Sequence, residues 1–186
     1  SRIFEALRET GEFKNTIIVL AGDNGLALGQ HGLMGKQNLY DHSVRVPLLM
    51  MGPGIPVGEQ RDVLCYLIDI YPTLCELTGH TIPKSVEGLS LGPALVDTAV
   101  PHRTHLHFAF TDLQRGVTDG RYKLIESITN DCLTTQLFDL RPDPWELNNL
   151  SDDQAFSSSV ARLRQELVKW RTELDDWGDL FWKGYE

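Results

Sequence analysis

The sequence has few cysteines, a shortage of basic residues and no long apolar run. Its 186 residues include 3 cysteines, and 17 lysines and arginines stand against 26 aspartates and glutamates. The formal charge of −9 argues against nucleic acid as a partner, because phosphates would be repelled and no basic cluster offsets the charge. No apolar run approaches the length that crosses a membrane, and the first residues lack a signal-peptide pattern.

The cysteines indicate neither a disulfide framework nor a metal site. Cys65, Cys75 and Cys132 are widely spaced, odd in number and match no zinc or redox spacing. We therefore expect buried thiols. Hydrophobic residues make up 41% of the chain and charged residues 23%, which is ordinary for a globular protein with one good core or two small ones.

The first 100 residues read as an α/β arrangement. Ile3, Phe4 and Leu7 have helical spacing, and the apolar run Thr16–Ala21 is typical of a buried strand. A helix that leads into a buried strand is the second half of a βαβ unit. We therefore expect a partial, mostly parallel sheet and a sequence that begins inside a longer fold. The alternative is that the helix simply starts the domain, with Ser1 as its cap.

Two further elements follow before a change in composition. Arg45–Met51 predicts a strand with Pro47 near its start, since proline cannot donate to an interior ladder. Residues 69–78 predict a helix with Asp69 as its N-cap, ended by Gly79. Composition shifts near residues 97–102, so we expect one domain over residues 1–100 and a smaller one over residues 101–186.

The second domain is expected to be a small antiparallel sheet covered by a helix. Leu106–Phe110 alternates like a half-buried strand, Asp119-Gly120 is a hairpin signal, and residues 136–140 predict another strand. Apolar residues then step by three and four from Val160 to Leu174, which indicates an amphipathic helix across one face of the sheet. The aromatic tail that follows predicts core packing, with a partner interface as the second choice.

Three histidines invite a metal interpretation that their spacing does not support. His102, His105 and His107 lie in or next to the alternating strand. Histidine spacing alone is a weak motif, and the polar face of a strand explains these residues with fewer assumptions.

A glycine-rich loop after the first strand carries the densest group of chemically useful residues. Asp23 and Asn24 follow the strand at once, and His31 and Lys36 come later in the same loop. Each has an ordinary interpretation as a turn residue, a loop histidine or a surface charge. Together they place two oxygen ligands, an imidazole and an ammonium beyond the carboxyl end of a strand, where open α/β sheets bind ligands.

These blocks resemble the type I sulfatases of the alkaline phosphatase superfamily. The similar segments are Asp23-Asn24-Gly25, Gly29-Gln-His-Gly32, Gly35-Lys36 and Tyr40-Asp-His-Ser-Val-Arg-Val-Pro47, followed by Gly52-Pro-Gly54 and the Leu-Phe-Asp-Leu, Asp-Pro, Glu and Asn-Asn-Leu pattern within residues 137–150. The resemblance covers nearly the whole chain in the family's order. It implies the C-terminal part of a sulfatase-type α/β core followed by a C-terminal subdomain.

The resemblance also assigns roles to the loop residues. Asp23 and Asn24 are similar to the family's metal-binding pair, and the metal is expected to be Ca²⁺, with Mg²⁺ less favoured. Lys36 is similar to the lysine that contacts the sulfate, and His31 is placed to touch the ester oxygen or the sulfate. Arg45 is expected to brace the site rather than bind substrate.

The family's nucleophile is not found in this sequence. Sulfatases use a formylglycine made from Cys or Ser in a Cys/Ser-x-Pro/Ala-x-Arg segment, and neither the three cysteines nor Ser158-Ser-Val-Ala-Arg162 has that context. We therefore expect a C-terminal fragment, inactive alone, whose N-terminal part carries the formylglycine and the partner carboxylates. Family precedent suggests a periplasmic or secreted enzyme, and a homo-oligomer is possible.

Three functions remain open at this point. The first is part of a sulfuric ester hydrolase acting on sulfated carbohydrate or aryl sulfate esters. The second is a phosphonate or phosphodiester hydrolase on the same fold, although Asn24 stands where those relatives usually carry His. The third is a non-catalytic binding module that kept the fold. A Cys-x-Pro-x-Arg motif just upstream in the coding sequence would decide for the enzyme.

Overall fold

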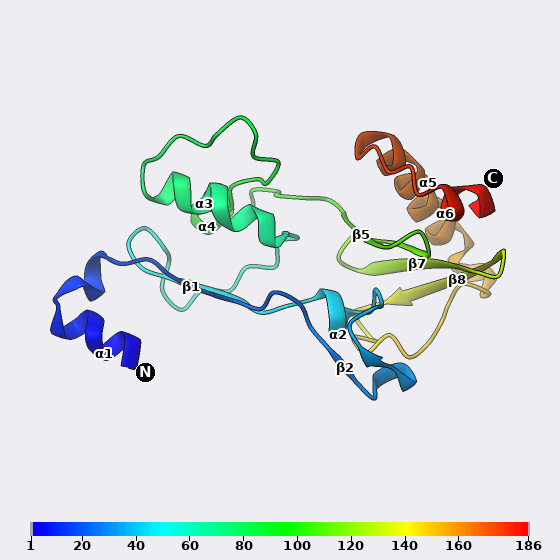
Figure 1. Cartoon of the computed structure of the whole chain (residues 1–186), viewed down its shortest axis with the longest axis horizontal. Coiled ribbons are helices and arrows are strands. Elements are labelled where there is room, and N and C mark those ends of the chain that lie inside the picture. The colour runs from blue at the N-terminus through cyan, green and yellow to red at the C-terminus, as the bar shows by residue number, and fades with distance from the viewer. Residues whose placement is uncertain (1, 186) are drawn as a thin grey trace. The chain divides into compact units, whose positions relative to one another are not determined.

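The computed structural model describes residues 2–185, apart from the side chain of Asp179, and divides them into two compact units. The first unit combines the residues up to Asp23 with Pro47–Arg103, and the second combines Asn24–Val46 with the residues from Thr104 onward (Figure 1). The chain passes from the first unit to the second between Arg103 and Thr104, near the predicted boundary at residue 100. Residues 24–46, however, belong to the second unit, so the expected division into domains at residue 100 stays a prediction.

The first unit contains short elements joined by long loops. Its helices are α1 (Arg2–Glu9), α3 (Ile70–Leu77) and α4 (Gly92–Val96), and its 3-10 helices are η1 (Glu12–Asn15) and η3 (Leu67–Asp69). Its strands are β1 (Ile18–Ala21) and β4 (Leu48–Met51). The predicted helices and strands are therefore present, and Gly79, at a φ of 72°, follows α3 as expected.

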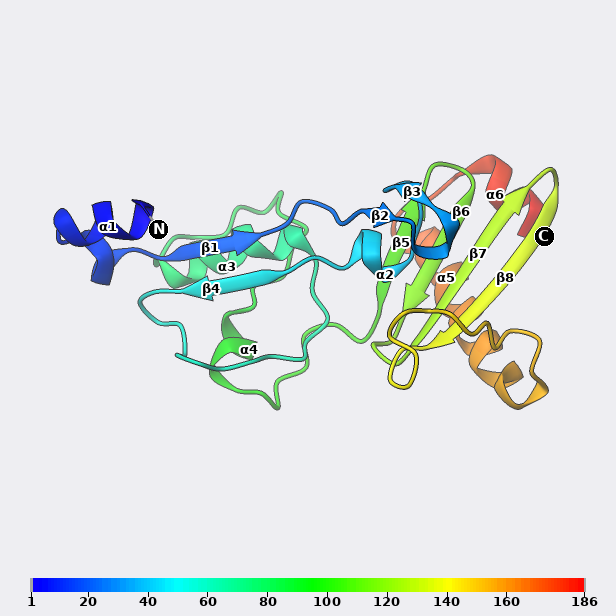
Figure 2. The ribbon, with the colours of Figure 1, turned by 90° about the horizontal axis from the view of Figure 1, so that it is seen from below.

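The prediction of a mostly parallel sheet is wrong for the first unit. β1 and β4 pair antiparallel, with Ile18 opposite Met51 and Ala21 opposite Leu48 (Figure 2). A parallel pair needs a crossover connection, usually through a helix that packs back on the sheet. The one α-helix between β1 and β4, a segment that the structure describes throughout, is the four-residue α2 (Asp41–Val44), and the chain returns beside β1 in the opposite direction.

A buried carboxylate organises the middle of the first unit. Asp69 has no exposed surface, and its oxygens accept hydrogen bonds from the backbone N–H groups of Tyr66 and Leu89, each at 2.8 Å. Arg103 Nη2 donates to Asp69 Oδ1 at 2.6 Å. The expected N-cap role is wrong, because the side chain of Asp69 makes no capping bond to α3. It ties the start of η3 to two distant loops instead.

The second unit is built on a four-stranded antiparallel sheet. The strands β5 (Leu106–Phe110), β6 (Gln114–Thr118), β7 (Tyr122–Thr129) and β8 (Cys132–Asp139) lie in sequence order. The predicted hairpin turn between β6 and β7 is confirmed. Asp119 Oδ1 accepts hydrogen bonds from the N–H groups of Arg121 and Tyr122, and Gly120 takes the positive φ of 87° that this turn requires.

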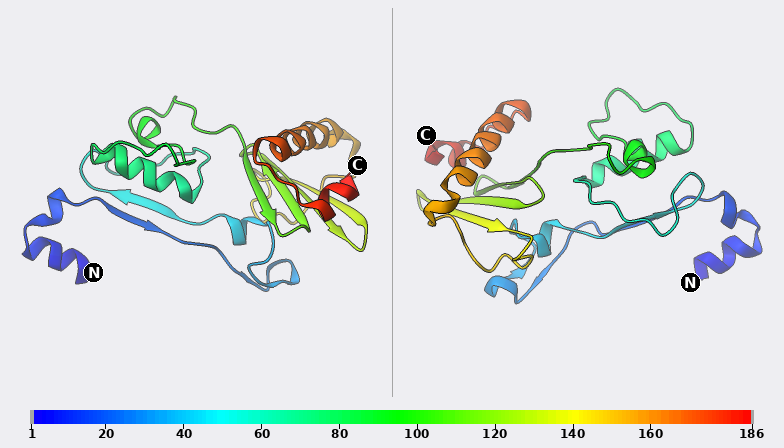
Figure 3. Two further views of the ribbon diagram at one scale, coloured as in Figure 1. Left: turned by 45° about the horizontal axis from the view of Figure 1, so that its top comes forward. Right: turned by 180° about the vertical axis from the view of Figure 1, so that it is seen from behind.

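Alternation along the strands gives this sheet two covered faces. Leu124 and Leu137 pack in one cluster with Leu163 and Leu167 of α5 (Ser157–Glu173). Their sequence neighbours Ile125 and Phe138 pack on the other face with Leu39. The views in Figure 3 agree that α5 lies on one side of the sheet and α2 on the other. The helix across one face is confirmed, and the covering of the second face by residues 24–46 is new.

The remaining elements of the second unit are small. They are β2 (Ala27–Leu28), the 3-10 helix η2 (Gln30–Gly32), β3 (Met34–Gly35), the 3-10 helix η4 (Gln154–Phe156) and α6 (Asp179–Tyr185). The aromatic tail packs in the core only in part, since Phe181 and Trp182 are at most 2% exposed but Trp177 is 58% exposed. Among residues 2–185, no helix is both long enough and apolar enough to cross a membrane.

The expectation of three buried thiols holds only in part. Cys75 is buried and Cys65 is half-buried, whereas Cys132 is exposed. Cys132 begins β8 directly after the turn residues Asn130 and Asp131, both of which have positive φ. Cys132 therefore lies beside the tip of a hairpin and stays exposed, whatever the hydrophobic character of its side chain.

Candidate active site

The loop after β1 is anchored at its start by close backbone contacts. Gly22 N–H donates to the Pro47 carbonyl at 3.2 Å, and Gly25 N–H donates to the Ser43 carbonyl at 2.8 Å. A Cβ on Gly25 would lie 2.0 Å from the His42 carbonyl oxygen. Only glycine therefore fits at this position.

Asp23 and Asn24 are the first sequence-predicted site residues, and both are exposed. The Asn24 side-chain amide donates to the Gly25 carbonyl at 2.8 Å. A carboxylate and an amide oxygen fit a hard divalent metal such as calcium, which prefers about six to eight oxygen ligands. Within the described residues, no cluster of three or more His, Cys, Asp or Glu side chains could hold a metal ion.

His31 is held in a fixed orientation. It adopts a positive φ of 53°, and its ring stacks on Tyr40 with centroids 3.9 Å apart and planes 6° apart. His31 Nε2 lies 3.1 Å from the Trp145 carbonyl oxygen. Because a carbonyl only accepts, Nε2 carries the proton and donates this bond. The other ring nitrogen, Nδ1, then carries the lone pair of the neutral ring.

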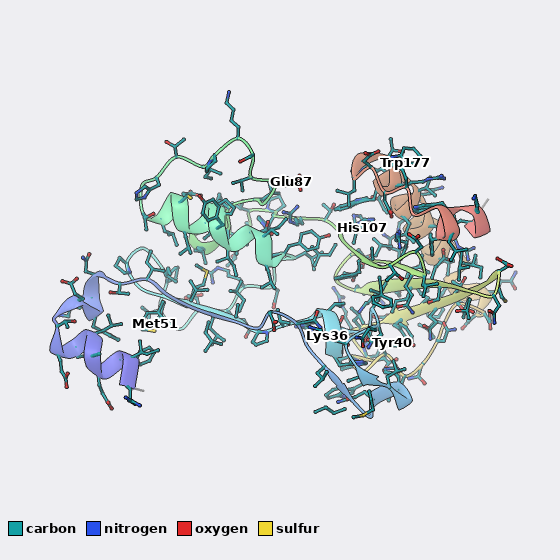
Figure 4. The ribbon with its side chains drawn as sticks, viewed as in Figure 1. Lys36, Tyr40, Met51, Glu87, His107 and Trp177 are labelled. Atoms are coloured by element: carbon teal, nitrogen blue, oxygen red, sulfur yellow. The ribbon has the colours of Figure 1, made fainter. Side chains whose placement is uncertain are left out.

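Lys36 follows Gly35 on an exposed stretch. Its backbone N–H donates to Gln37 Oε1 at 3.0 Å, and Gly35 has a φ of 108°. Figure 4 labels Lys36 and Tyr40 on the chain that leads into α2. The structure thus brings His31 and Tyr40 into contact, while Lys36, Asp23 and Asn24 are exposed. Arg45, expected to brace the site, is exposed with its Nη1 3.7 Å from Asp41.

A buried ionic cluster beneath this loop was not predicted from the sequence. Lys123 of β7 has no exposed surface, and its Nζ lies 2.7 Å from Asp41 Oδ1 and 2.8 Å from Glu146 Oε1. The Asp41 backbone N–H donates to Glu146 Oε2 at 2.6 Å. One feature of the sequence hinted at it, a lysine directly before the apolar pair Leu124-Ile125.

Two pKa shifts follow from this burial. Burial raises the pKa of Glu146, and the ammonium of Lys123 opposes the shift without cancelling it. Burial lowers the pKa of the neighbouring His42, with His31 and Lys123 adding to the effect. His42 is consequently a neutral imidazole at neutral pH, and its Nε2 is buried without a hydrogen-bond partner among the described residues.

The three histidines of the strand region do not form a metal site within the described residues. His102 Nε2 lies 3.3 Å from Asp69 Oδ2 in the first unit. His107 stacks on Trp170 with centroids 3.5 Å apart, and burial lowers the pKa of His107 to about 3. His102 therefore belongs to the polar cluster around Asp69, and His107 packs against α5.

Comparison with known proteins gives a family and a set of related structures. Residues 29–173 match the family described as N-sulphoglucosamine sulphohydrolase, C-terminal. Arylsulfatase K of Xenopus laevis is 32% identical over 162 residues, which is 80% of this chain and 30% of that protein.

Two solved structures show the same fold. BT4656 in complex with its substrate D-glucosamine-2-N,6-O-disulfate has a TM-score of 0.83 at 26% identity, over 96% of this chain and 39% of that chain. A phosphonate monoester hydrolase from Silicibacter pomeroyi has a TM-score of 0.77 at 27% identity, over 92% and 38%. The chain therefore spans between about a third and two fifths of the length of these relatives.

The family match over residues 29–173 and the likeness to the solved structures define the class as the C-terminal region of a sulfatase. This chain belongs to the N-sulphoglucosamine sulphohydrolase C-terminal family, which matches most of its length.

Proposed function

We propose that this chain is the C-terminal part of a metal-dependent sulfuric ester hydrolase and supplies metal and sulfate ligands to it. The observation that carries the proposal is the loop of residues 23–36. It contains the carboxylate, amide, imidazole and ammonium groups that make the loop similar to the sulfatase site. The Gly25–Ser43 hydrogen bond and the His31–Tyr40 stack attach this loop firmly to a folded unit. Such attachment is what a preorganised site needs.

Four residues of the loop have chemical roles in this proposal. Asp23 and Asn24 would hold a divalent metal, for which we favour Ca²⁺ over Mg²⁺ because an exposed, irregular set of oxygen ligands suits the larger ion. When bound there, such an ion would supply Lewis-acid polarisation of the sulfate group. Lys36 stabilises the negative charge that develops on the sulfate group and the leaving oxygen. His31, through Nδ1, contacts the ester oxygen or the sulfate.

The rest of the enzyme completes the site in this proposal. The N-terminal part contributes the formylglycine and the remaining carboxylate ligands, and it is the chain's principal partner. We expect the enzyme to be periplasmic or secreted, and a homo-oligomer is compatible with the exposed surfaces. The substrate class that we favour is sulfated carbohydrate, because the similar structure of BT4656 holds a sulfated glucosamine.

A phosphonate or phosphodiester hydrolase is the second candidate. It is favoured by the likeness to the phosphonate monoester hydrolase, which has the same fold at a similar level of identity. The decisive experiment compares the complete enzyme on an aryl sulfate, an aryl phosphonate and an aryl phosphodiester. We expect the highest kcat/KM for the sulfate. A clear preference for the phosphonate would move the proposal to the second candidate, and no activity on any of the three would favour a binding module.

A further inference from the structure

His31 lies in a small hairpin that is too short to hold the imidazole in place alone. The strands β2 and β3 on either side of it pair at two residue positions, and an isolated hairpin is marginal in water. His31 also has a φ of 53°, which a residue other than glycine keeps only where its surroundings enforce it. Here the surroundings come from outside the hairpin. The ring of Tyr40 stacks on the imidazole, and the carbonyl of Trp145 accepts the bond from Nε2.

Each of the two groups that hold the imidazole adjoins a residue of the buried ionic cluster. Tyr40 is followed by Asp41, and Trp145 is followed by Glu146. The Asp41 N–H donates to Glu146 Oε2 at 2.6 Å, so the two backbone segments are joined directly. Lys123 Nζ lies 2.7 Å from Asp41 Oδ1 and 2.8 Å from Glu146 Oε1, which fastens both segments to β7. The cluster therefore sets how the Tyr40 ring and the Trp145 carbonyl lie relative to each other.

This arrangement costs free energy that a contact made only for stability would not require. Lys123 has no exposed surface and Glu146 is 2% exposed. Moving such charges out of water is unfavourable, and well-packed apolar side chains often stabilise a fold as much as a buried ion pair does. Glu146 also has a positive φ of 57°, so strained backbone flanks the His31–Trp145 hydrogen bond on both sides. Strain that the surrounding structure enforces is typical of functional sites.

We propose that Glu146 and Lys123 are positioning residues for His31. They fix the carbonyl of Trp145 and the ring of Tyr40, and these two groups keep the imidazole in one orientation. The inference rests on the proposed function for what His31 does, and it adds two buried residues that act through His31 rather than on the substrate. Such support is what holds a site residue within the narrow geometry that chemistry requires.

The first test is spectroscopic and needs no activity. In the complete enzyme with ¹³C-labelled histidine rings, the ring C–H signals of His31 should lie upfield, because the π electrons of the stacked Tyr40 shield protons above its face. The signal is identified by its loss in His31→Ala. Glu146→Gln places an amide N–H₂ against the donors of the cluster, so it should loosen the stack and move the signal toward that of an exposed histidine.

Glu126→Gln is the matched control for this measurement. Glu126 is another glutamate of β7 with no exposed surface, and its Oε1 lies 2.7 Å from Arg164 Nη2 of α5. Its replacement also disturbs a buried ion pair of the second unit, but it should leave the His31 signal in place. An unmoved signal in folded Glu146→Gln, or an equal movement in Glu126→Gln, would overturn the proposal.

The second test is a double-mutant cycle on kcat/KM for an aryl sulfate. Glu146→Gln should lower kcat/KM about tenfold in the wild-type background, as expected for a misplaced site residue. In the His31→Ala background, the same change should lower kcat/KM less than about twofold, because no imidazole is left to misplace. A role in stability alone would lower kcat/KM by the same factor in both backgrounds, and that result would also overturn the proposal.

A second variant covers the case in which Glu146→Gln does not fold. The Asp143 carboxylate supports the same loop by accepting hydrogen bonds from the N–H groups of Leu147 and Asn148 at 3.0 and 2.8 Å. Asp143→Ala should therefore move the His31 signal in the same direction, and an unmoved signal would overturn the proposal.

The two tests keep this inference distinct from the proposed function. A His31 signal that depends on Glu146, in an enzyme without activity on sulfate esters, would retain the positioning role and refute the sulfatase. Turnover of the aryl sulfate together with an unmoved signal would retain the sulfatase and refute the positioning role.

Discussion

The two units differ in what holds them together. The second unit buries a sheet with apolar clusters on both of its faces. The first unit has a two-stranded ribbon whose Leu20 and Leu49 are 59% and 60% exposed, and its α1 buries no residue. A two-stranded sheet alone is marginal in water. The centre of the first unit is instead a polar cluster around Asp69. One unit thus depends mainly on apolar burial, and the other on a single carboxylate and its donors.

Within the first unit, the largest expected effect is at Asp69. Asp69→Asn should cost about 3–5 kcal/mol in the stability of the first unit, because it leaves the half-buried Arg103 beside a neutral partner at a site with no exposed surface. Native-state hydrogen exchange of the α3 amides would measure this loss. Unchanged exchange in α3 would mean that the cluster does not organise the unit. Asp97→Asn, a change to an exposed acid of the same unit, is the control.

The same residue predicts a pH dependence. Burial opposes ionisation of Asp69, but hydrogen bonds from Arg103, Tyr66 and Leu89 outweigh it and the pKa of Asp69 is lowered. Stability from this carboxylate is therefore present above its unfolded pKa of about 4 and is lost as the pH falls through the lower folded pKa. The difference between wild type and Asp69→Asn should shrink on acidification below about pH 4. A difference that stays constant to pH 2 would contradict this.

A matched pair of leucines tests the apolar side of the comparison. Leu167 is 2% exposed in the second unit, whereas Leu49 is 60% exposed in the first. In this chain, Leu167→Ala should cost about 2–5 kcal/mol through a buried cavity, and Leu49→Ala less than about 0.5 kcal/mol. Urea unfolding monitored separately for each unit would measure both. Equal costs would remove the distinction between the units.

Lys36 is expected to matter for activity and not for stability. In the complete enzyme, Lys36→Ala should lower kcat by about a hundredfold or more, as for loss of one preorganised donor to developing charge. The melting temperature should barely change, because the side chain is exposed. Lys84→Ala, another exposed loop lysine, serves as the control. Full activity of Lys36→Ala at saturating substrate would return Lys36 to an ordinary surface charge.

The smallest effect is expected for a surface ion pair of the second unit. Lys169 lies 3.8 Å from Glu166 and 3.7 Å from Glu173 on α5, and its side chain is 58% exposed. Lys169→Met should change stability by less than about 0.5 kcal/mol. Lys123→Met, which removes the buried lysine between Asp41 and Glu146, should cost several-fold more, about 3–5 kcal/mol. If denaturant unfolding gave similar losses of stability for the two variants, the buried lysine would stabilise the unit no more than the exposed one.

Local patterns in the sequence predicted most of the elements. Periodicity gave β1, β4, β5 and α5, and the Asp119-Gly120 turn gave the β6–β7 hairpin. Strand direction was beyond these patterns, because an apolar run such as Thr16–Ala21 looks the same in a parallel and an antiparallel pair. The packing of Leu39 on the second face of the sheet was also hidden, since it depends on residues far away in the sequence.

The loop residues of the candidate site could be predicted from the sequence, but the buried contacts around them could not. The loop with Asp23, Asn24, His31 and Lys36 was found from its residues and its resemblance, and its roles remain proposals. The pairing of the buried Lys123 with Glu146 could not be predicted from the sequence. Alternation along a strand tells which residues share a face, but it does not tell whether a charged residue on that face is covered by a partner from elsewhere in the chain. The contact between His31 and Trp145 joins positions 114 residues apart, and no local pattern encodes it.

Calcium titration of this chain and of the complete enzyme tests the central claim most directly. The account predicts that the complete enzyme binds calcium and loses affinity about tenfold or more on Asp23→Ala, since a carboxylate ligand is removed. It also predicts that residues 1–186 alone bind calcium only weakly and hydrolyse no aryl sulfate, because Asp23 and Asn24 provide only part of the shell. Micromolar calcium affinity together with turnover by the isolated chain would contradict the claim that it holds only part of the site.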